Sequence, residues 1–556
     1  MRLASALLLS LWLSITPFAQ EAAKSRATIE GFVTKDPDSQ PVKKVLIELI
    51  AENQSEAGNY TAITGPNGAF RIENVLPGRY HLFAERPGLL DGERQRGRSD
   101  GRLLTLAPGQ ELNDVHIRLQ AAAVVRGRVT DEDGEPMPDA EVTVLRSTFA
   151  GGHNRWEPAG ADNTNDLGEY RIANLPAGNF YVAVNPPPNF KSLIENAGLA
   201  AEAHNGSVPD KPALTTYQSN YYPGTTDRSQ AAPIQLRAGD DFPVNFSLTP
   251  SPSLSIRGTV VNLPPRTSAT IMLQSRDFNL IMNGAEIHKD GAFIIRDVSP
   301  GSYTIVASVD GSTTPMTARQ AIQVGSTNID GVRLAPQPGA SIRGHLRVES
   351  KGSAVRLDPE QIFLSLHSMD AGDDDHAFSM GENLMNVARL ARDGSFEWSD
   401  VPAGTYYVQL TGNRGPNEDL CLKSVLQSGR EANDAGVSVN GGTVTLDVVA
   451  SASGGVIEGV AANRKGEAVA NAVIVAVPEA RLRARVDRYR QTVSDQGGRF
   501  ALHGLPAGEY TVYAWENVEG DEYYNPGFLK GFEGQGLHLS EGERKTVQVS
   551  AISDEQ

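Results

Sequence analysis

The sequence predicts an all-β protein made of five tandem antiparallel β-sandwich domains. One pattern recurs five times along the 556 residues: Asp or Asn with Gly, an aromatic strand, a Pro/Gly turn and a second aromatic strand. The copies lie 100 to 123 residues apart, the length of a whole domain rather than of a solenoid repeat. Abundant turn formers, 55 Gly and 33 Pro, agree with many short strands. The first aromatic residues of the copies are Phe70, Tyr170, Phe293, Phe396 and Phe500.

Each copy begins with a strand that carries a Gly in its interior, such as IEGFV at 29–33 and IEGVA at 457–461. In copies 1, 2 and 5 a polar turn and a strand rich in β-branched residues follow, as in VLIELIA at 45–51. These segments are typical of the first two strands of a sandwich.

The recurring core of each copy predicts a β-hairpin. Asn, Asp and Gly tolerate the left-handed backbone of a tight turn, and they precede the first aromatic strand. In copy 1, Phe70 and Ile72 share one face of that strand, and Tyr80 and Leu82 share one face of the next. Pro77 fixes φ for the turn between them. We therefore expect the two strands to pair and to send both rings into one core.

A second hairpin-like pair of strands around a Gly ends each copy, for example at 103–119 and 537–550. The elements add up to about six or seven strands per copy, as in a β-sandwich. Helical patterning is confined to 190–203 and 479–490. The expected domains are residues 27–120, 122–249 with a loop insertion at 185–220, 254–335, 341–450 and 455–551, after a signal peptide at 1–23.

Composition and charge exclude several classes of protein. The formal net charge of −17 disfavours nucleic acid, because phosphates would be repelled. Arg2, the apolar run 3–13 and the small residues at 19–23 are typical of a secretory signal peptide. No other stretch is apolar for long enough to cross a bilayer, so we expect no transmembrane segment after signal cleavage. Cys421 is the single cysteine, which rules out an intramolecular disulfide and favours a bacterial envelope origin.

The order of these motifs resembles the carboxypeptidase regulatory-like domain, a transthyretin-related (prealbumin-type) β-sandwich. Copy 2 carries VRGRVTDEDGEPMPDAEVTVL and then DLGEYRIANLPAGNFYVAV, and copy 5 carries VIEGVAANRKGEAVANAVIVAV and then GGRFALHGLPAGEYTVYAWE. Copies 1, 2 and 5 match well, whereas copies 3 and 4 lack the turn between their first two strands. The resemblance implies an accessory or binding module, grouped with carbohydrate-binding-like sandwiches and often attached to peptidases or outer-membrane receptors.

No catalytic or metal constellation stands out, so we predict no enzyme activity, no cofactor and no metal site. His538 and Glu541 form an H-x-x-E, but no further His follows to complete a zinc site. Residues 97–101 match G-x-S-x-G without the strand and helix that this motif needs. The acidic run 370–376 offers calcium ligands, but its spacing matches no EF-hand, so a solvated insertion is the favoured interpretation.

Five aromatic residues outside the alternating pattern are the candidate ligand-binding residues. They lie beside Pro or Gly, or near them, in segments expected to be loops: Trp156, Tyr221, Tyr222, Tyr523 and Tyr524. Exposed rings on a rigid sandwich suit stacking on sugars or contact with a partner. The alternative, which we favour, is that each Tyr pair anchors a long loop to its own domain.

The sequence thus predicts an exported, non-catalytic interaction or scaffold protein of a bacterial cell envelope, periplasmic or secreted. Its expected partner is an envelope protein or polysaccharide. The alternative is a carbohydrate-binding protein that uses the loop aromatics, and an enzyme is a third hypothesis because a fold never excludes a grafted site. Short linkers, among them TPSPS at 249–253 and APQPGA at 335–340, predict an elongated rod of sandwiches.

Overall fold

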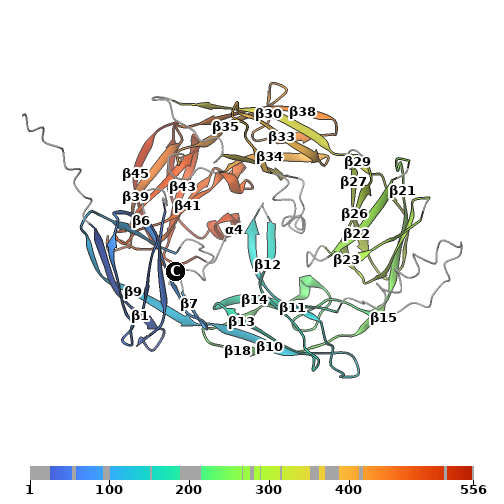
Figure 1. The fold of residues 1–556 in the computed structure, drawn as a ribbon, viewed down its shortest axis with the longest axis horizontal. Helices are drawn as coiled ribbons and strands as arrows, with labels where there is room; N and C mark the ends of the chain where they lie inside the picture. Colours follow the sequence, from blue (N-terminus) through green and yellow to red (C-terminus); the bar gives the residue numbers. More distant parts are fainter. Residues whose placement is uncertain are drawn as a thin grey trace, which may run out of the picture.

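The computed structural model forms five β-sandwiches in chain order, numbered here 1 to 5 (Figure 1). Each has its own hydrophobic core, so the predicted fold class is confirmed. The structure describes residues 26–52, 58–91, 101–150, 153–187, 215–265, 267–275, 281–288, 290–312, 316–350, 362–369, 387–411, 418–518 and 522–553.

The first two sandwiches and the linker after them contain twenty strands. Sandwich 1 comprises β1 (Ala27–Lys35), β2 (Gln40–Pro41), β3 (Leu46–Ala51), β4 (Tyr60–Ile63), β5 (Ala69–Val75), β6 (Gly78–Glu85), β7 (Leu89–Asp91), β8 (Arg102–Leu106) and β9 (Glu111–Ala121). Sandwich 2 and its linker comprise β10 (Ala123–Thr130), β11 (Glu141–Ala150), β12 (His153–Asn163), β13 (Glu169–Leu175), β14 (Gly178–Asn185), β15 (Thr215–Tyr217), β16 (Asn220–Tyr221), η2 (Arg228–Gln230), β17 (Ile234–Leu236), β18 (Asp241–Pro243), β19 (Phe246–Ser247) and β20 (Pro250–Pro252).

The last three sandwiches continue the same order of elements. Sandwich 3 and its linker comprise β21 (Leu254–Val260), β22 (Ser268–Ser275), β23 (Ile281–Gly284), β24 (Glu286–Ile287), β25 (Ala292–Val298), β26 (Gly301–Asp310), β27 (Met316–Val324), β28 (Ile329–Leu334) and β29 (Gln337–Pro338). Sandwich 4 comprises β30 (Ala340–Glu349), β31 (Phe363–Ser368), β32 (Val387–Arg389), β33 (Ser395–Val401), β34 (Gly404–Thr411), β35 (Cys421–Gln427), β36 (Arg430–Glu431), β37 (Val437–Val439) and β38 (Thr443–Ser451). Sandwich 5 comprises β39 (Gly455–Ala462), β40 (Val473–Pro478), η6 (Ala480–Leu482), η7 (Val486–Arg488), β41 (Arg490–Val493), β42 (Arg499–Leu505), β43 (Gly508–Trp515), η8 (Glu522–Tyr524), α4 (Pro526–Leu529), β44 (Gln535–Leu539) and β45 (Arg544–Ile552).

Sandwich 1 illustrates the sheet order. One sheet runs β2-β1-β9-β7 with β5 also paired to β1, and the other runs β4-β3-β6-β8. Most pairs are antiparallel, as predicted. The first and last strands of each sandwich pair in parallel, which the sequence did not indicate: β1 with β9, β10 with β18, β21 with β28, β30 with β38 and β39 with β45.

The predicted aromatic hairpin is wrong in all five sandwiches. In sandwich 1, β5 pairs with β1, whereas β6 pairs with β3 and β8 in the opposite sheet. The chain therefore crosses from one sheet to the other at the Pro77-Gly78 corner. In sandwiches 1 to 4 the strands that end the copy, such as β8 and β9, also lie in different sheets. In sandwich 5 the ending strands β44 and β45 share one sheet, but each pairs with β43. Alternation could not distinguish the two arrangements, because the rings reach the same core from either sheet.

The interior Gly of each first strand faces the first aromatic residue of its copy across the sheet. A Cβ on Gly31 would lie 2.1 Å from the Val115 carbonyl oxygen and 2.8 Å from the Phe70 ring. Only a residue without a side chain admits both the ring and the last strand at this distance. The pairs are Gly31–Phe70, Gly127–Tyr170, Gly258–Phe293, Gly344–Phe396 and Gly459–Phe500.

The second aromatic residue holds the corner between the sheets. The Tyr80 hydroxyl donates to the Leu76 carbonyl oxygen at 2.6 Å, four residues upstream, as in the tyrosine corner of other sandwiches. Tyr303, Tyr406 and Tyr510 make the same bond at 2.9 to 3.0 Å. Phe180 stands at this position in sandwich 2 and has no hydroxyl. Tyr in four of the five copies thus follows from a hydrogen bond as well as from burial.

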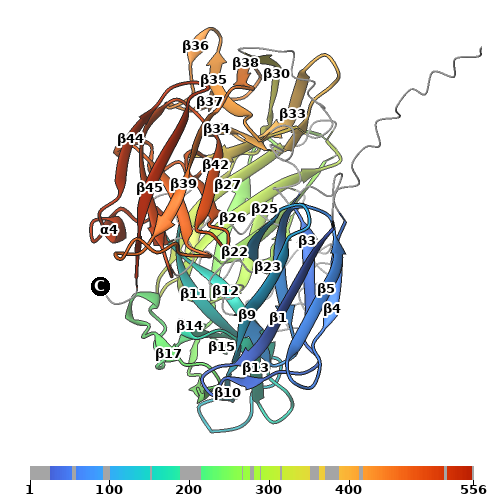
Figure 2. The same ribbon diagram turned by 90° about the vertical axis from the view of Figure 1, so that its left-hand side faces the viewer.

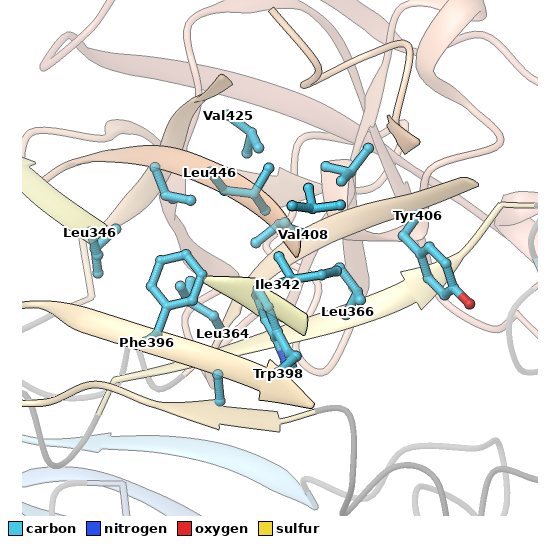
Figure 3. Packing of buried hydrophobic residues seen from close by; sticks show 14 of the residues in the cluster. Ile342, Leu346, Leu364, Leu366, Phe396, Trp398, Tyr406, Val408, Val425 and Leu446 are labelled. Atoms are coloured by element: carbon cyan, nitrogen blue, oxygen red, sulfur yellow. The ribbon is translucent and has the colours of Figure 1, made fainter. Parts of the chain in front are cut away.

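The core of sandwich 4 shows how the two sheets meet (Figure 3). Phe396 and Trp398 extend from β33 toward Ile342 and Leu364, and their ring centroids lie 5.0 Å apart at 67°. Trp398 is 2% exposed. A Trp buried to this degree adds about 150 to 250 Å² of buried area to the core.

The sandwiches form a ring, so the predicted rod is wrong (Figure 1). Sandwich 5 lies beside sandwich 1, as the side view in Figure 2 also shows, and the Gln496 side chain bonds to the Thr105 backbone. Strand β11 of sandwich 2 also lies against η8 of sandwich 5. Only Ala122 separates β9 from β10. Linkers this short make the joints stiff, but their composition does not reveal the angle at which neighbours meet.

Helical structure is sparse in the described part of the chain. The segment 479–490, where the sequence indicated a helix, holds only the short 3₁₀ turns η6 and η7. No helix among the described residues has the length and apolarity needed to span a membrane.

Candidate functional site

The first aromatic cluster covers the outer face of a sheet in sandwich 2. Trp156 lies on β12 rather than in a loop, and its ring stacks on Tyr181 with centroids 4.3 Å apart. Tyr221, on β16, meets Trp156 edge-on at 5.6 Å. The Arg228 guanidinium lies 4.5 Å from the Trp156 ring centroid. Tyr221 is 2% exposed, whereas Trp156 and Tyr222 are partly exposed.

The second aromatic cluster covers the corresponding outer face of sandwich 5. Tyr523 lies on η8, is 4% exposed, and donates its hydroxyl proton to Gln491. Tyr524 contacts Tyr523 and Tyr489, each with centroids 4.7 Å apart. The cluster surrounds Trp515, which is 1% exposed. The η8–α4 segment is thereby packed onto its own sheet.

The five candidate residues fall into two sets, and η8, which carries Tyr523 and Tyr524, lies against β11 of sandwich 2. Three belong to sandwich 2 and two to sandwich 5. Tyr222 packs against the main core of sandwich 2, and the other four pack on outer faces of their own sandwiches, the arrangement expected of loop anchors. Tyr221 and Tyr523 are buried and offer no ring face to a ligand. Ligand binding through Trp156, Tyr222 and Tyr524 stays a prediction.

The junction between sandwiches 4 and 5 holds a dense group of charges. Lys423 Nζ lies 2.7 Å from Glu349 Oε2 and 3.3 Å from Glu541 Oε2 across the junction. The Ser451 hydroxyl donates to Glu541 at 2.7 Å. Arg481 of sandwich 5 bonds to Asp434 of sandwich 4 at 2.5 Å. These bonds fix one sandwich against the other.

Buried arginines extend this junction inward. Arg485 holds both oxygens of Asp487, at 2.7 and 2.8 Å, and donates to the Asn433 carbonyl oxygen at 2.6 Å. Its guanidinium lies 4.3 Å from the ring centroid of Tyr407. Arg488 is 6% exposed; burial lowers the pKa of its guanidinium, and the charge of Asp487 opposes that shift.

Sequence reasoning missed these junction residues. The available signal was the run RLRARVDRYR at 481–490, unusually basic for an acidic chain, which we interpreted as a helix instead. Their partners lie tens of residues away, so pairing depends on how the two sandwiches meet.

A cavity of about 290 Å³ opens at this junction and is lined by Cys421, Lys423, Arg488, Tyr510 and Glu541 among others. Cys421 is 3% exposed, and burial raises the pKa of its thiol to about 11. A thiol that stays protonated is a poor nucleophile. Burial likewise raises the pKa of Tyr510 to about 12.

The H-x-x-E pair does not converge on a metal position. His538 Nδ1 lies 2.7 Å from Glu509, whereas Glu541 bonds to Lys423 and Ser451. Among the described residues, no three His, Cys, Asp or Glu side chains are grouped so as to hold a metal ion.

Several predicted features lie outside the described residues. They are the signal peptide at 1–23, most of the insertion at 185–220, the G-x-S-x-G segment except Gly101, and the acidic run at 370–376.

A comparison with known families found a match to the first two sandwiches. The family model of the carboxypeptidase regulatory-like domain matches residues 28–120 and 124–194. These two sandwiches are carboxypeptidase regulatory-like domains. No curated protein matches the chain in sequence.

A buried hydroxyl accompanies the family pattern in the carboxypeptidase regulatory-like domains and in sandwich 5. Thr64 accepts from the Val45 N–H at 3.0 Å and donates to the Val42 carbonyl oxygen at 2.7 Å. Thr164 and Ser494 make the equivalent bonds in sandwiches 2 and 5. The hydroxyl clamps the turn between the first two strands, the element that copies 3 and 4 lack in sequence.

Solved structures with some likeness include three bacterial proteins. The Bacillus anthracis TIE protein is 10% identical, with a TM-score of 0.17 over 56% of this chain and 51% of that one, so this chain spans about half its length. A streptococcal ancillary pilin is 12% identical, with a TM-score of 0.18 over 56% of this chain and 100% of the pilin. The minor pilin of Streptococcus agalactiae is 12% identical, with a TM-score of 0.21 over 41% and 97%. Values this low carry no information on function.

Proposed function

We propose that the protein is an exported, non-catalytic interaction or scaffold protein of a bacterial cell envelope. One observation carries the proposal: the residues that recur in every copy are used in packing. The strand Gly makes room for the first ring, and the second aromatic, Tyr in four copies, fills the core and closes the corner. The residues that recur in every copy therefore serve to keep each sandwich rigid.

The joints between sandwiches also support a scaffold role. The salt bridges of Lys423 and Arg481 hold sandwiches 4 and 5 together. At the junction of sandwiches 2 and 3, Tyr217 bonds to Glu132 at 2.9 Å, and its carbonyl oxygen accepts from Ser299 at 3.1 Å. Fixed joints present surface loops of different sandwiches at constant separations, which suits simultaneous contact with a partner. The net charge of −17 favours a partner other than nucleic acid.

Expression of the full chain with a C-terminal tag tests export and interaction together. We expect cleavage between residues 19 and 23, recovery in the envelope or medium, and specific cross-linked partners. An uncleaved cytoplasmic protein would contradict export. Turnover of generic peptidase, esterase or glycosidase substrates by the purified chain would contradict the non-catalytic assignment.

Carbohydrate binding is the second candidate, and the partly exposed Trp156 next to Arg228 favours it. A glycan array measures it directly. We expect any signal to fall in Trp156→Ala and to persist in Trp398→Phe, because Trp398 is a core residue. A signal unchanged by Trp156→Ala would contradict this candidate.

A further inference from the structure

An exposed Asn precedes two glycines where the chain crosses between the sheets of sandwich 4. Asn440, Gly441 and Gly442 connect β37 to β38, and all three are exposed. Gly441 and Gly442 have left-handed φ angles of 89° and 70°, and a Cβ added to either would meet no described atom within 4 Å. Within the described part of the chain, no hydrogen bond reaches the Asn440 side chain or the Gly441 N–H.

An Asn that precedes a Gly can lose its side-chain amide without an enzyme. The backbone nitrogen of the Gly forms a bond to Cγ of the Asn and gives up its proton, and the side-chain nitrogen leaves as ammonia. Water then opens the cyclic imide, which yields aspartate on one side and isoaspartate on the other. Closure of the ring requires a backbone N–H that is free and a backbone that can rotate, and Gly hinders neither because it has no Cβ.

The same dipeptide at Asn67-Gly68 is held by hydrogen bonds. Asn67 Oδ1 accepts from the Ala69 N–H at 3.2 Å, and the Gly68 N–H donates to the Gly65 carbonyl oxygen at 3.0 Å. Gly68 is also buried. Both bonds must open before the Gly68 nitrogen can reach the side chain, so this site is protected.

The dipeptide at residues 283–284 is held in a different way. It lies on β23, and both residues are in register with β22 in the antiparallel ladder. The ring can close there only if β23 leaves the ladder. A fourth Asn-Gly, at 205–206, lies outside the described residues.

We propose that Asn440 is a site of spontaneous deamidation, which converts it to a mixture of aspartate and isoaspartate. Its exposure, the free Gly441 N–H and the two consecutive glycines distinguish it from the two held sites. The product adds a negative charge beside the start of the sandwich, because the Gly442 carbonyl oxygen accepts from the Ser341 N–H at 2.9 Å. Isoaspartate also inserts one more main-chain carbon between β37 and β38. The inference goes beyond the proposed function and does not depend on it.

Peptide mapping by mass spectrometry tests the proposal on the purified full chain aged in mildly alkaline buffer made with oxygen-18 water. The heavy oxygen marks each amide hydrolysed during ageing, and fragmentation of the tryptic peptide 431–464 locates it. We expect Asn440 to be lost about thirtyfold faster than Asn67, the ratio that corresponds to opening the two hydrogen bonds of the held site. Residues 283–284 should also be slower than Asn440. A synthetic peptide of residues 437–445 supplies the rate of the unrestrained dipeptide.

Gly441→Ala and Gly442→Ala are matched variants, because each places a Cβ in open space at a left-handed φ and so carries similar backbone strain. Gly441→Ala should slow the loss of Asn440, since the new side chain hinders the attacking nitrogen, whereas Gly442→Ala leaves that nitrogen unchanged. Equal rates in the two variants would overturn the proposal. So would loss of Asn67 as fast as that of Asn440, or retention of Asn440 while the synthetic peptide is converted. If either variant fails to fold, the comparison of sites within the wild type decides.

Discussion

Substitution of Gly459 by Ala tests how the repeat packs. A Cβ at Gly459 would lie 1.8 Å from the Val547 carbonyl oxygen and 3.2 Å from the Phe500 ring. Carbon and oxygen that are not bonded approach to about 3.3 Å, so β45 must move away by more than about 1 Å. Overpacking of this kind costs about 1 to 3 kcal/mol, and loss of a ladder bond adds about 1 kcal/mol. We expect sandwich 5 to lose about 3 kcal/mol of unfolding free energy.

Hydrogen–deuterium exchange measured by mass spectrometry resolves this loss within the full chain. Amides of β39, β42 and β45 should exchange about a hundredfold faster in Gly459→Ala, because tenfold corresponds to about 1.4 kcal/mol. Sandwich 3 serves as the internal reference. The matched control is Gly536→Ala, also in a strand of sandwich 5, where no atom lies within 4 Å of the added Cβ. Equal protection in both variants would refute the reasoning.

Four further predictions concern the corner, the cysteine and the ring. Tyr510→Phe removes the hydrogen bond to the Pro506 carbonyl oxygen. It should accelerate amide exchange in sandwich 5 about fivefold, which corresponds to a loss of about 1 kcal/mol of unfolding free energy. An unchanged exchange rate would contradict a stabilising role for this hydrogen bond. Native Cys421 should not react with a thiol reagent at pH 8, and fast reaction before unfolding would contradict its burial. The pKa of the Cys421 thiol rises from 9.0 to about 11 on folding, so this thiol ionises at lower pH in the unfolded chain than in the folded chain. The free energy of unfolding should therefore fall by up to about 3 kcal/mol between pH 9 and pH 11. The variant Cys421→Ala should lack that part of the decline. Small-angle scattering of the whole chain should give the distance distribution of a compact particle, whereas a rod would give one with a long tail.

The sequence predicted the features that depend on neighbours within one copy. Phe70 and Ile72 alternate because one face of their strand is buried, and the same alternation marks Tyr80 and Leu82. This alternation could not distinguish a hairpin within one sheet from a corner between two sheets, since both arrangements place the rings in the same core. The parallel pairing of the first and last strands joins residues too far apart in the chain for local patterns to report.

The contacts between sandwiches could not be predicted, for a different physical reason. Gln496 and Thr105 are 391 residues apart, and their meeting depends on the summed angles of four joints. Arg481 and Arg485 lie in the segment 479–490, where we expected a helix, whereas their partners Asp434 and Asn433 lie on sandwich 4. The candidate aromatic residues were expected in loops, but Trp156 and Tyr221 lie on strands β12 and β16, and Tyr221 is buried.

The parallel pairing of first and last strands has a mechanical consequence. In sandwich 5 the chain enters at the start of β39 and leaves at the end of β45, at opposite ends of one seven-residue ladder from Val456–Arg544 to Ala462–Ser550. A force that pulls these two ends apart loads that ladder lengthwise, so its bonds must fail together instead of opening one by one. A pull between the two ends of each of the other sandwiches would load its parallel pairing in the same way.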